Sequence, residues 1–192
     1  MKKILFKISG LLTILIVFFI IYKTVLFISG QTYFERGKNS FLIANEDDCF
    51  DHQKLEDAIL NFEMAIKKGN KERELFDELA SSYYMLNGDN YNAERIYDKG
   101  IINYPNDAEF YFCRANCKKE QKKFKSAFLD YEKCIDLAKS KKVDFIKEAI
   151  YNRGAMSYML GDFLSAEKDW KLAQMKTNYK LRTYQDYSQL WK

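Results

Sequence analysis

Apolar and polar residues alternate with a helical period over most of this chain, and residues 111–137 show the pattern most clearly. This stretch contains two helical patterns that are separated near Lys122-Lys123. In the second one, Ala127, Tyr131 and Cys134 follow each other at intervals of four and three residues, so they share one helix face. Small residues on that face let a neighbouring helix approach closely, and the ring fills the space beside them. The pattern therefore predicts two helices packed against each other.

The same spacing of a small residue, an aromatic ring and another small residue occurs four times. The leading alanines are separated by 35, 34 and 39 residues. Such a repeat distance is typical of arrays in which each unit is one pair of helices. The four copies are Ala58-x-x-x-Phe62-x-x-Ala65, Ala93-x-x-x-Tyr97-x-x-Gly100, Ala127-x-x-x-Tyr131-x-x-Cys134 and Ala166-x-x-x-Trp170-x-x-Ala173.

A second pattern precedes each copy: a bulky residue, a pair three and four positions later, and a further position three after the pair. The four examples are Tyr33 with Arg36-Gly37 and Ser40, Phe76 with Leu79-Ala80 and Tyr83, Tyr111 with Arg114-Ala115 and Lys118, and Ile150 with Arg153-Gly154 and Ser157. One helix pair cannot bury its own apolar face, so successive pairs must stack. In the second copy we expect Leu79, Tyr83, Tyr97 and Ile101 to fill one such layer.

This phased pattern resembles the tetratricopeptide repeat family over roughly residues 31–179. Leu160-Gly161-Asp162-Phe163 is similar to the family's turn between helices, and Pro105-Asn106-Asp107 is similar to the end of a unit. The resemblance implies an all-α, right-handed α-solenoid with repeats at about 31–70, 73–107, 108–145 and 147–179. Insertions around 45–52, near Asn87 and around 140–143 are expected to fall in loops.

The C-terminal tail is predicted to cover the last repeat. Residues 180–192 place Leu181, Tyr184, Tyr187 (or Ser188) and Trp191 at helical spacing. An exposed terminal repeat needs a cover for its apolar face. We therefore expect a capping helix over 180–192.

Residues 4–28 form the longest apolar stretch. The stems of Lys7 and Lys23 can reach toward lipid headgroups, which gives a tilted helix enough length to span a bilayer. Two alternatives are a cleaved signal peptide, although no clear cleavage site follows, and a buried helix. We predict a single-pass anchor at 1–29, with the repeat domain at 30–192. The flanking charges give only a slight orientation preference. It places the domain outside the cytoplasm, in the periplasm if the organism is a bacterium.

The charge distribution argues against a nucleic-acid partner. The formal net charge of +4 comes from Lys2, Lys3, Lys7 and Lys23, and the remaining sequence holds 27 basic and 27 acidic residues. The predicted domain therefore lacks the overall basic excess of a nucleic-acid binder. A single proline and 8 glycines favour helices over a turn-rich β fold.

No motif in the sequence points to catalysis. The only histidine, His52, lies in the acidic inserted loop, where Glu46, Asp47, Asp48 and Asp51 cluster. We interpret His52 as an exposed loop residue. The acidic run lacks the glycine and final glutamate of a calcium-binding loop, so weak divalent-cation binding is only an alternative. There is no phosphate-binding loop, nucleophile elbow or HExxH motif. We predict no enzyme, no cofactor, no metal and no small-molecule substrate.

The four cysteines lack the paired C-x-x-C spacing of zinc sites. Cys49 lies in the inserted loop, Cys113 and Cys117 on the first helix of the third copy, and Cys134 at a small position of its second helix. We interpret the three helical cysteines as small buried residues. A disulfide between Cys117 and Cys134 in an oxidising compartment, and a metal site, are the alternatives.

The resemblance implies that the first helices line a concave groove for a protein or peptide partner. Carried over by position, this groove comprises Phe34, Lys38, Phe41, Asp77, Ser81, Tyr84, Phe112, Asn116, Lys119, Tyr151, Ala155 and Tyr158. Some members of the family clamp a terminal carboxylate. Here only Lys38, Asn116 and Lys119 could contribute to a clamp and Asp77 opposes it, so we do not predict that ligand. The alternative is that several of the rings merely pack against neighbouring helices.

Together these features predict a membrane-anchored protein–protein interaction module, acting as an assembly or scaffolding factor. Exposed aromatic side chains are effective anchors for a partner. The alternative is a structural accessory subunit that associates through its transmembrane helix or its outer faces.

Overall fold

The protein is built from helices that pack in consecutive pairs. The computed structural model describes residues 13–20, 28–45, 51–139, 143–178 and 180–189. After a short helix at 13–20, its helices are α2 (Gly30–Ala44), α3 (His52–Lys67), α4 (Arg73–Asn87), α5 (Asn90–Asn103), α6 (Ala108–Glu120), α7 (Phe124–Ala138), α8 (Ile146–Met159), α9 (Phe163–Met175) and α10 (Tyr184–Ser188). This confirms the predicted all-α fold.

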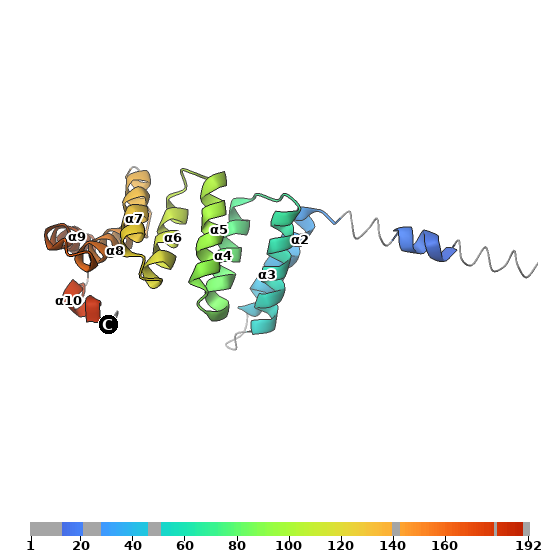
Figure 1. The fold of residues 1–192 in the computed structure, drawn as a ribbon, viewed down its shortest axis with the longest axis horizontal. Coiled ribbons are helices and arrows are strands. Elements are labelled where there is room, and N and C mark those ends of the chain that lie inside the picture. Colours follow the sequence, from blue (N-terminus) through green and yellow to red (C-terminus); the bar gives the residue numbers. More distant parts are fainter. Residues whose placement is uncertain (1–12, 21–27, 46–50, 140–142, 179, 190–192) are drawn as a thin grey trace, which may run out of the picture.

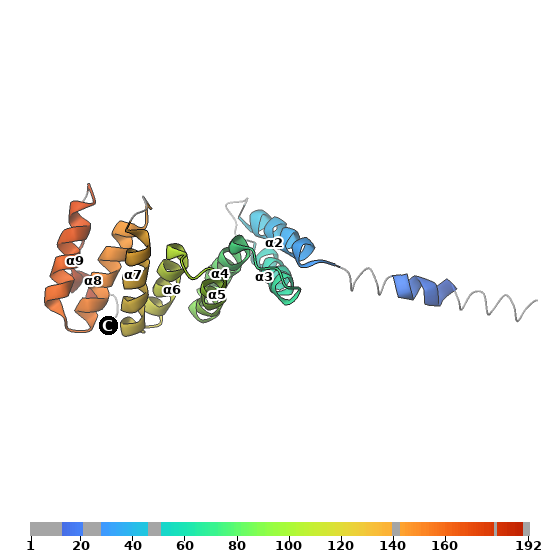
Figure 2. The same ribbon diagram turned by 90° about the horizontal axis from the view of Figure 1, so that it is seen from above.

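The pairs α2/α3, α4/α5, α6/α7 and α8/α9 follow one another along a single axis (Figure 1). Each helix packs chiefly against its neighbours in the sequence, and the view from above shows the pairs turning gradually along the stack (Figure 2). The short helix at 13–20 extends away from α2 at one end of this stack. The arrangement is the α-solenoid that the repeated pattern predicted.

Polar side chains cap the N-termini of five helices among the described residues. The side chains of Ser29, Asp51, Asp89, Asp107 and Asp162 each accept a hydrogen bond from a backbone N–H in the first turn of the following helix. These bonds satisfy donors that a helix leaves without an internal partner. His52 is therefore the first residue of α3, which corrects its predicted place in the loop.

Residues with a left-handed backbone conformation form the tight turns inside the second, third and fourth helix pairs. Gly88 has φ of +63° and Gly161 has φ of +86°, while the third pair uses Lys122 with φ of +59°. Glycine adopts this conformation without a steric penalty, whereas lysine does not. The helix break predicted near Lys122-Lys123 is confirmed, but it is formed by a residue with no preference for that backbone.

The small residues of the repeated pattern lie where helices approach closely. Ala58, Ala93, Ala127 and Ala166 are all buried, as are the residues seven positions after them. Gly37 shows the need for space: a Cβ there would lie 2.4 Å from the Phe62 ring. The predicted layer also forms, because Leu79 and Tyr97 are buried in one core with Tyr83 and Ile101 packed against it.

Ion pairs between half-buried arginines and buried aspartates are a feature that the apolar pattern did not predict. Arg114 Nη2 on α6 donates to Asp130 Oδ1 on α7 at 2.6 Å, and Arg153 Nη2 on α8 donates to Asp169 Oδ1 on α9 at 2.6 Å. The second guanidinium bond in each pair comes from Nε, at 2.7 and 2.8 Å. Each arginine therefore joins the two helices of its pair in a bidentate contact.

The C-terminal cover is shorter than predicted. Residues 180–183 are not helical, and α10 covers only Tyr184–Ser188. The backbone carbonyl of Arg182 accepts hydrogen bonds from Trp170 Nε1 at 3.0 Å and from the Tyr151 hydroxyl at 3.1 Å. These bonds from α9 and α8 hold the chain in a non-helical conformation before α10. Trp191 lies outside the described residues.

Most of the predicted anchor also lies outside the described residues, since 1–12 and 21–27 are not among them. Within the described part of the chain, no helix combines the length and apolar character needed to cross a bilayer. The helix at 13–20 exposes apolar side chains, including Phe18 at 69% and Phe19 at 58%.

Candidate partner-binding groove

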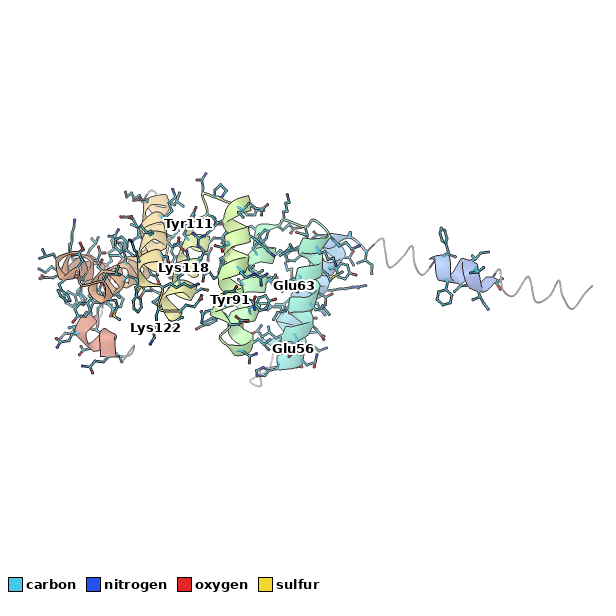
Figure 3. The ribbon with its side chains drawn as sticks, in the orientation of Figure 1. Glu56, Glu63, Tyr91, Tyr111, Lys118 and Lys122 are labelled. Atoms are coloured by element: carbon cyan, nitrogen blue, oxygen red, sulfur yellow. The ribbon has the colours of Figure 1, made fainter. Side chains whose placement is uncertain are left out.

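The predicted groove residues lie on the first helices of the four pairs. Phe34, Lys38 and Phe41 are on α2, Asp77, Ser81 and Tyr84 on α4, Phe112, Asn116 and Lys119 on α6, and Tyr151, Ala155 and Tyr158 on α8. In Figure 1, α3 and α5 lie in front of α2 and α4, so the viewer sees the second-helix side of these repeats. Tyr91 and Glu63, labelled in Figure 3, lie on those second helices.

Four of the predicted residues line one hollow of about 450 Å³ between successive repeats. They are Ser81 and Tyr84 of α4 with Asn116 and Lys119 of α6. The other residues that line the hollow are Met85, Asn90, Tyr97, Cys113, Cys117, Glu120 and Glu148. Stacking thus brings side chains from three first helices, α4, α6 and α8, to one site.

Tyr84 offers the most accessible ring of this hollow. Tyr84 is 55% exposed, whereas Tyr97, which lines the same hollow, is 5% exposed. A large exposed ring beside a hollow is a typical anchor point for a partner side chain. Tyr84 is the aromatic residue of the predicted groove that most clearly remains available.

Asn116 and Lys119 have partners within the protein. Asn116 Oδ1 accepts hydrogen bonds from the Tyr131 hydroxyl at 2.6 Å and from Asn152 Nδ2 at 3.4 Å. Lys119 Nζ lies 3.4 Å from Glu120 Oε1. Asn116 therefore connects the third repeat to the fourth, and the charge of Lys119 is offset by its neighbour.

The remaining predicted rings pack largely against other helices. Phe34 is 1% exposed, with its ring centroid 6.0 Å from that of Phe62. Phe112 is 9% exposed and stacks on Phe145 at 5.1 Å. Packing against neighbouring helices, the alternative raised from the sequence, therefore accounts for these two rings.

At the last repeat, Tyr184 of α10 covers the predicted groove residues. The Tyr184 ring centroid lies 5.0 Å from that of Tyr151 and 6.2 Å from that of Tyr158. Its hydroxyl donates to the backbone carbonyl of Tyr151 at 2.8 Å. The chain's own C-terminal segment thus occupies this part of the first-helix surface.

Near the first repeat, the predicted residues join a set of charges. Lys38 Nζ donates to Glu74 Oε2 at 3.1 Å, and this hydrogen bond raises the pKa of Lys38. Arg73 contacts Asp77, Asp107 and Glu109. Burial raises the pKa of Asp77 despite the nearby Arg73. The cations on this surface are therefore already engaged with carboxylates.

Glu78 and Glu148 are site residues that the position-by-position reasoning missed. Glu78 follows Asp77, and its buried Oε2 atom has no hydrogen-bond partner among the residues that the structure describes. Burial raises the pKa of this carboxyl to about 7. Glu148 precedes Tyr151 by three residues, one helical turn earlier on the same face. Extending the predicted positions by one turn would have identified Glu148.

The described cysteines are free thiols. Cys113 and Cys117 line the hollow, and burial raises the pKa of each to about 12. Cys117 and Cys134 belong to separate apolar clusters, so the alternative of a bridge between them is not formed in this structure. Among the described residues, no group of three His, Cys, Asp or Glu side chains is placed to hold a metal ion.

Comparisons with known proteins give the same fold. A search of family models found no match to the sequence, and neither did a search of curated proteins. Among solved structures, MamA is similar with a TM-score of 0.61 and 18% identity, covering 80% of this chain and 79% of MamA.

Two further similar structures are of TPR proteins that bind peptides. The first TPR of Spaghetti (RPAP3), bound to an HSP90 peptide, has a TM-score of 0.54 and 19% identity, covering 69% of this chain and 94% of that chain. YrrB, described as a TPR protein with an unusual peptide-binding site, has a TM-score of 0.60 and 17% identity, covering 76% and 67%. These similarities show a solenoid of the tetratricopeptide repeat type.

Proposed function

We propose that this chain is a membrane-anchored protein–protein interaction module that holds a segment of a partner protein in its first-helix groove. The observation that carries this proposal is the hollow between α4, α6 and α8, where the exposed Tyr84 ring lies beside Ser81, Asn116 and Lys119. The mechanism is binding without catalysis. Two similar structures are described with a bound peptide or a peptide-binding site, which supports a peptide segment as the occupant.

The membrane anchor gives the module its second proposed property. The apolar sequence 4–28 supports a spanning helix. Ser29 caps α2 by accepting a hydrogen bond from the Thr32 N–H at 3.1 Å, so the repeat domain begins almost directly after this segment. Such a short connection would confine a captured partner close to the bilayer. We therefore propose an assembly or scaffolding role, and the slight charge preference of the flanking residues favours a domain outside the cytoplasm.

Site-specific crosslinking tests the groove. A photoreactive phenylalanine analogue replaces Tyr84 in full-length protein in native membranes, and crosslinked products are identified by mass spectrometry. The matched control places the analogue at Tyr91, a 63% exposed tyrosine on the second helix of the same repeat. We expect a distinct partner at position 84 and none at 91. Equal crosslinking at both positions, or none at 84, contradicts the groove.

A structural accessory subunit is the second candidate function. It is favoured by apolar side chains on the outside of α9, where Leu164 and Met175 are each 84% exposed. Large exposed apolar patches mark association surfaces. If Leu164→Ser with Met175→Ser releases the partner while Tyr84→Ser retains it, this second function replaces the first.

A further inference from the structure

The hollow of the proposed groove carries an excess of negative charge. Its lining contains two carboxylates, Glu120 and Glu148, and one cation, Lys119. Lys119 lies 3.4 Å from Glu120, which leaves Glu148 as the carboxylate with no ion pair or hydrogen bond among the described residues. Glu148 is exposed at the start of α8. A partner segment that enters this hollow therefore meets one uncompensated negative charge.

The Tyr84 ring complements this charge. It is 55% exposed at the same hollow and makes no ring or cation contact within the described residues. Cationic side chains bind favourably over the faces of tyrosine rings. A carboxylate and an aromatic face beside one hollow match the two properties of a Lys or Arg side chain, an apolar stem and a positive head.

The neighbouring surface extends the same preference. Glu35, Glu74 and Asp77 all lie close enough to Glu78 to influence its carboxyl group, and the cations of this group are Lys38 and Arg73, the latter paired with Asp77. Lys38 is already bonded to Glu74. Bringing another anionic group to this surface would add repulsion, whereas a basic segment would add attraction.

From these observations we infer that the hollow between α4, α6 and α8 receives a Lys or Arg side chain from a basic partner segment. The inference rests on the proposed function and names the chemistry of the partner. The cation occupies the space beside Glu148 and Tyr84, and the rest of its segment passes the carboxylates of α4 toward α2.

Selection from a display library of randomised dodecapeptides tests this inference on the full-length protein in detergent micelles. We expect the enriched peptides to share a Lys or Arg at one fixed position. Enrichment should be lost on Tyr84→Ser protein and weakened on Glu148→Gln protein. The matched controls are Tyr91→Ser on α5 and Glu132→Gln, an exposed glutamate on α7. Both controls should retain the enrichment.

Affinity measurements on one enriched peptide then locate its basic side chain. We expect Glu148→Gln to weaken binding about fivefold, a typical effect for one charge contact of this kind. Replacing the basic residue of the peptide by Ala should remove the difference between the parent protein and Glu148→Gln. If Glu148→Gln and the Ala substitution in the peptide weaken binding additively, the cation binds elsewhere and the inference is wrong.

The selection also separates this inference from the proposed function. Tyr84-dependent enrichment of neutral or acidic peptides overturns the basic partner but leaves the groove intact. Enrichment that does not depend on Tyr84, or no enrichment at all, overturns both.

Discussion

The second and the last repeats fill the same structural positions with opposite chemistry. In the second repeat, Leu79 of α4 and Ile96 of α5 are 0% and 3% exposed and share one apolar core. In the fourth repeat, the corresponding residues are Arg153 and Asp169, joined by hydrogen bonds of 2.8 and 2.6 Å. The third repeat has the same chemistry as the fourth, with Arg114 and Asp130 at these positions.

This difference shows what the repeat fold requires at these positions. An apolar pair stabilises the helix contact by burial and is tolerant of small shifts. A bidentate ion pair adds orientation but must offset the desolvation of two charges. Both solutions bury a matched pair between the two helices. The solenoid therefore requires complementarity within each pair rather than one residue type.

Removing half of an ion pair should have the largest effect. Asp169→Ala leaves the half-buried Arg153 without its carboxylate, and we expect a loss of about 3 kcal/mol in the free energy of unfolding. Chemical denaturation measures this loss. Hydrogen exchange should place the increased opening in α8 and α9, because repeat units depend mainly on their neighbours.

Converting the fourth repeat to the chemistry of the second is the matching control. Arg153→Leu with Asp169→Ile should unfold within about 1 kcal/mol of the parent protein, because apolar replacements of buried ion pairs are often neutral or stabilising. A double variant as unstable as Asp169→Ala would show that the ion pair has a role beyond complementarity.

The end repeats also differ from the central ones in the first-helix residue that follows the Arg153 position. Gly37 and Gly154 occupy it at the ends, and Ala80 and Ala115 in the middle. A Cβ on Gly154 would lie 2.2 Å from the Tyr184 hydroxyl and 2.7 Å from Asp169 Cβ. We expect Gly154→Ala to destabilise the protein by about 2 kcal/mol through overpacking. Thermal unfolding measures the effect.

Fluorescence shows whether the cover moves in that variant. The Trp170 indole donates to Arg182 just before α10, so its emission should shift to longer wavelength if the cover detaches. A Trp191→Phe background isolates this signal, since the chain has two tryptophans. Tyr184→Phe removes the nearest atom and should reduce the penalty of Gly154→Ala. If the losses of stability from Gly154→Ala and Tyr184→Phe simply add, the clash does not involve the Tyr184 hydroxyl.

Unpaired and paired carboxylates should respond differently to pH. Burial raises the pKa of Glu78 from 4.5 to about 7, so the folded state binds this proton more tightly than the unfolded chain. The resulting stabilisation is fully present below about pH 4.5 and is lost as the pH rises through about 7. Glu78→Gln should flatten the stability profile over this range and raise the melting temperature at pH 8.

The control for this prediction is Glu72→Gln, an exposed glutamate just before α4 that makes no side-chain cap. Its pH profile should match that of the parent protein. A Glu78→Gln profile that also matches the parent would indicate that another group causes the pH dependence.

The turns between paired helices give the smallest expected effect. Lys122 has the positive φ that Gly88 and Gly161 provide in the second and fourth repeats. Lys122→Gly should stabilise the protein by about 0.5–1 kcal/mol, because relief of the left-handed strain exceeds the entropy that glycine adds to the unfolded chain. Lys133→Gly, at an exposed position in the middle of α7, should destabilise the protein instead. A loss of stability in Lys122→Gly would mean that the Lys122 side chain compensates for its strain.

Part of the candidate site followed from position alone, and part did not. Carrying over the first-helix positions located Ser81, Tyr84, Asn116 and Lys119, which share one hollow. The same reasoning could not show that Phe112 stacks on Phe145, because Phe145 lies after the insertion around 140–143. It could not show that Tyr184 covers Tyr151, because the path of the tail depends on hydrogen bonds from α8 and α9.

The helix pairs can be read from the amino-acid sequence alone, because periodic small and aromatic residues, polar caps and turn residues act over a few positions of the chain. The order of the repeats can be read from it too, since each unit must bury its apolar face against the next. Which rings remain exposed, and which described carboxylates lack a partner, depends instead on how the repeats stack. Phe112 meets Phe145, and Tyr151 meets Tyr184, across 33 positions of the chain, so these contacts leave no local pattern.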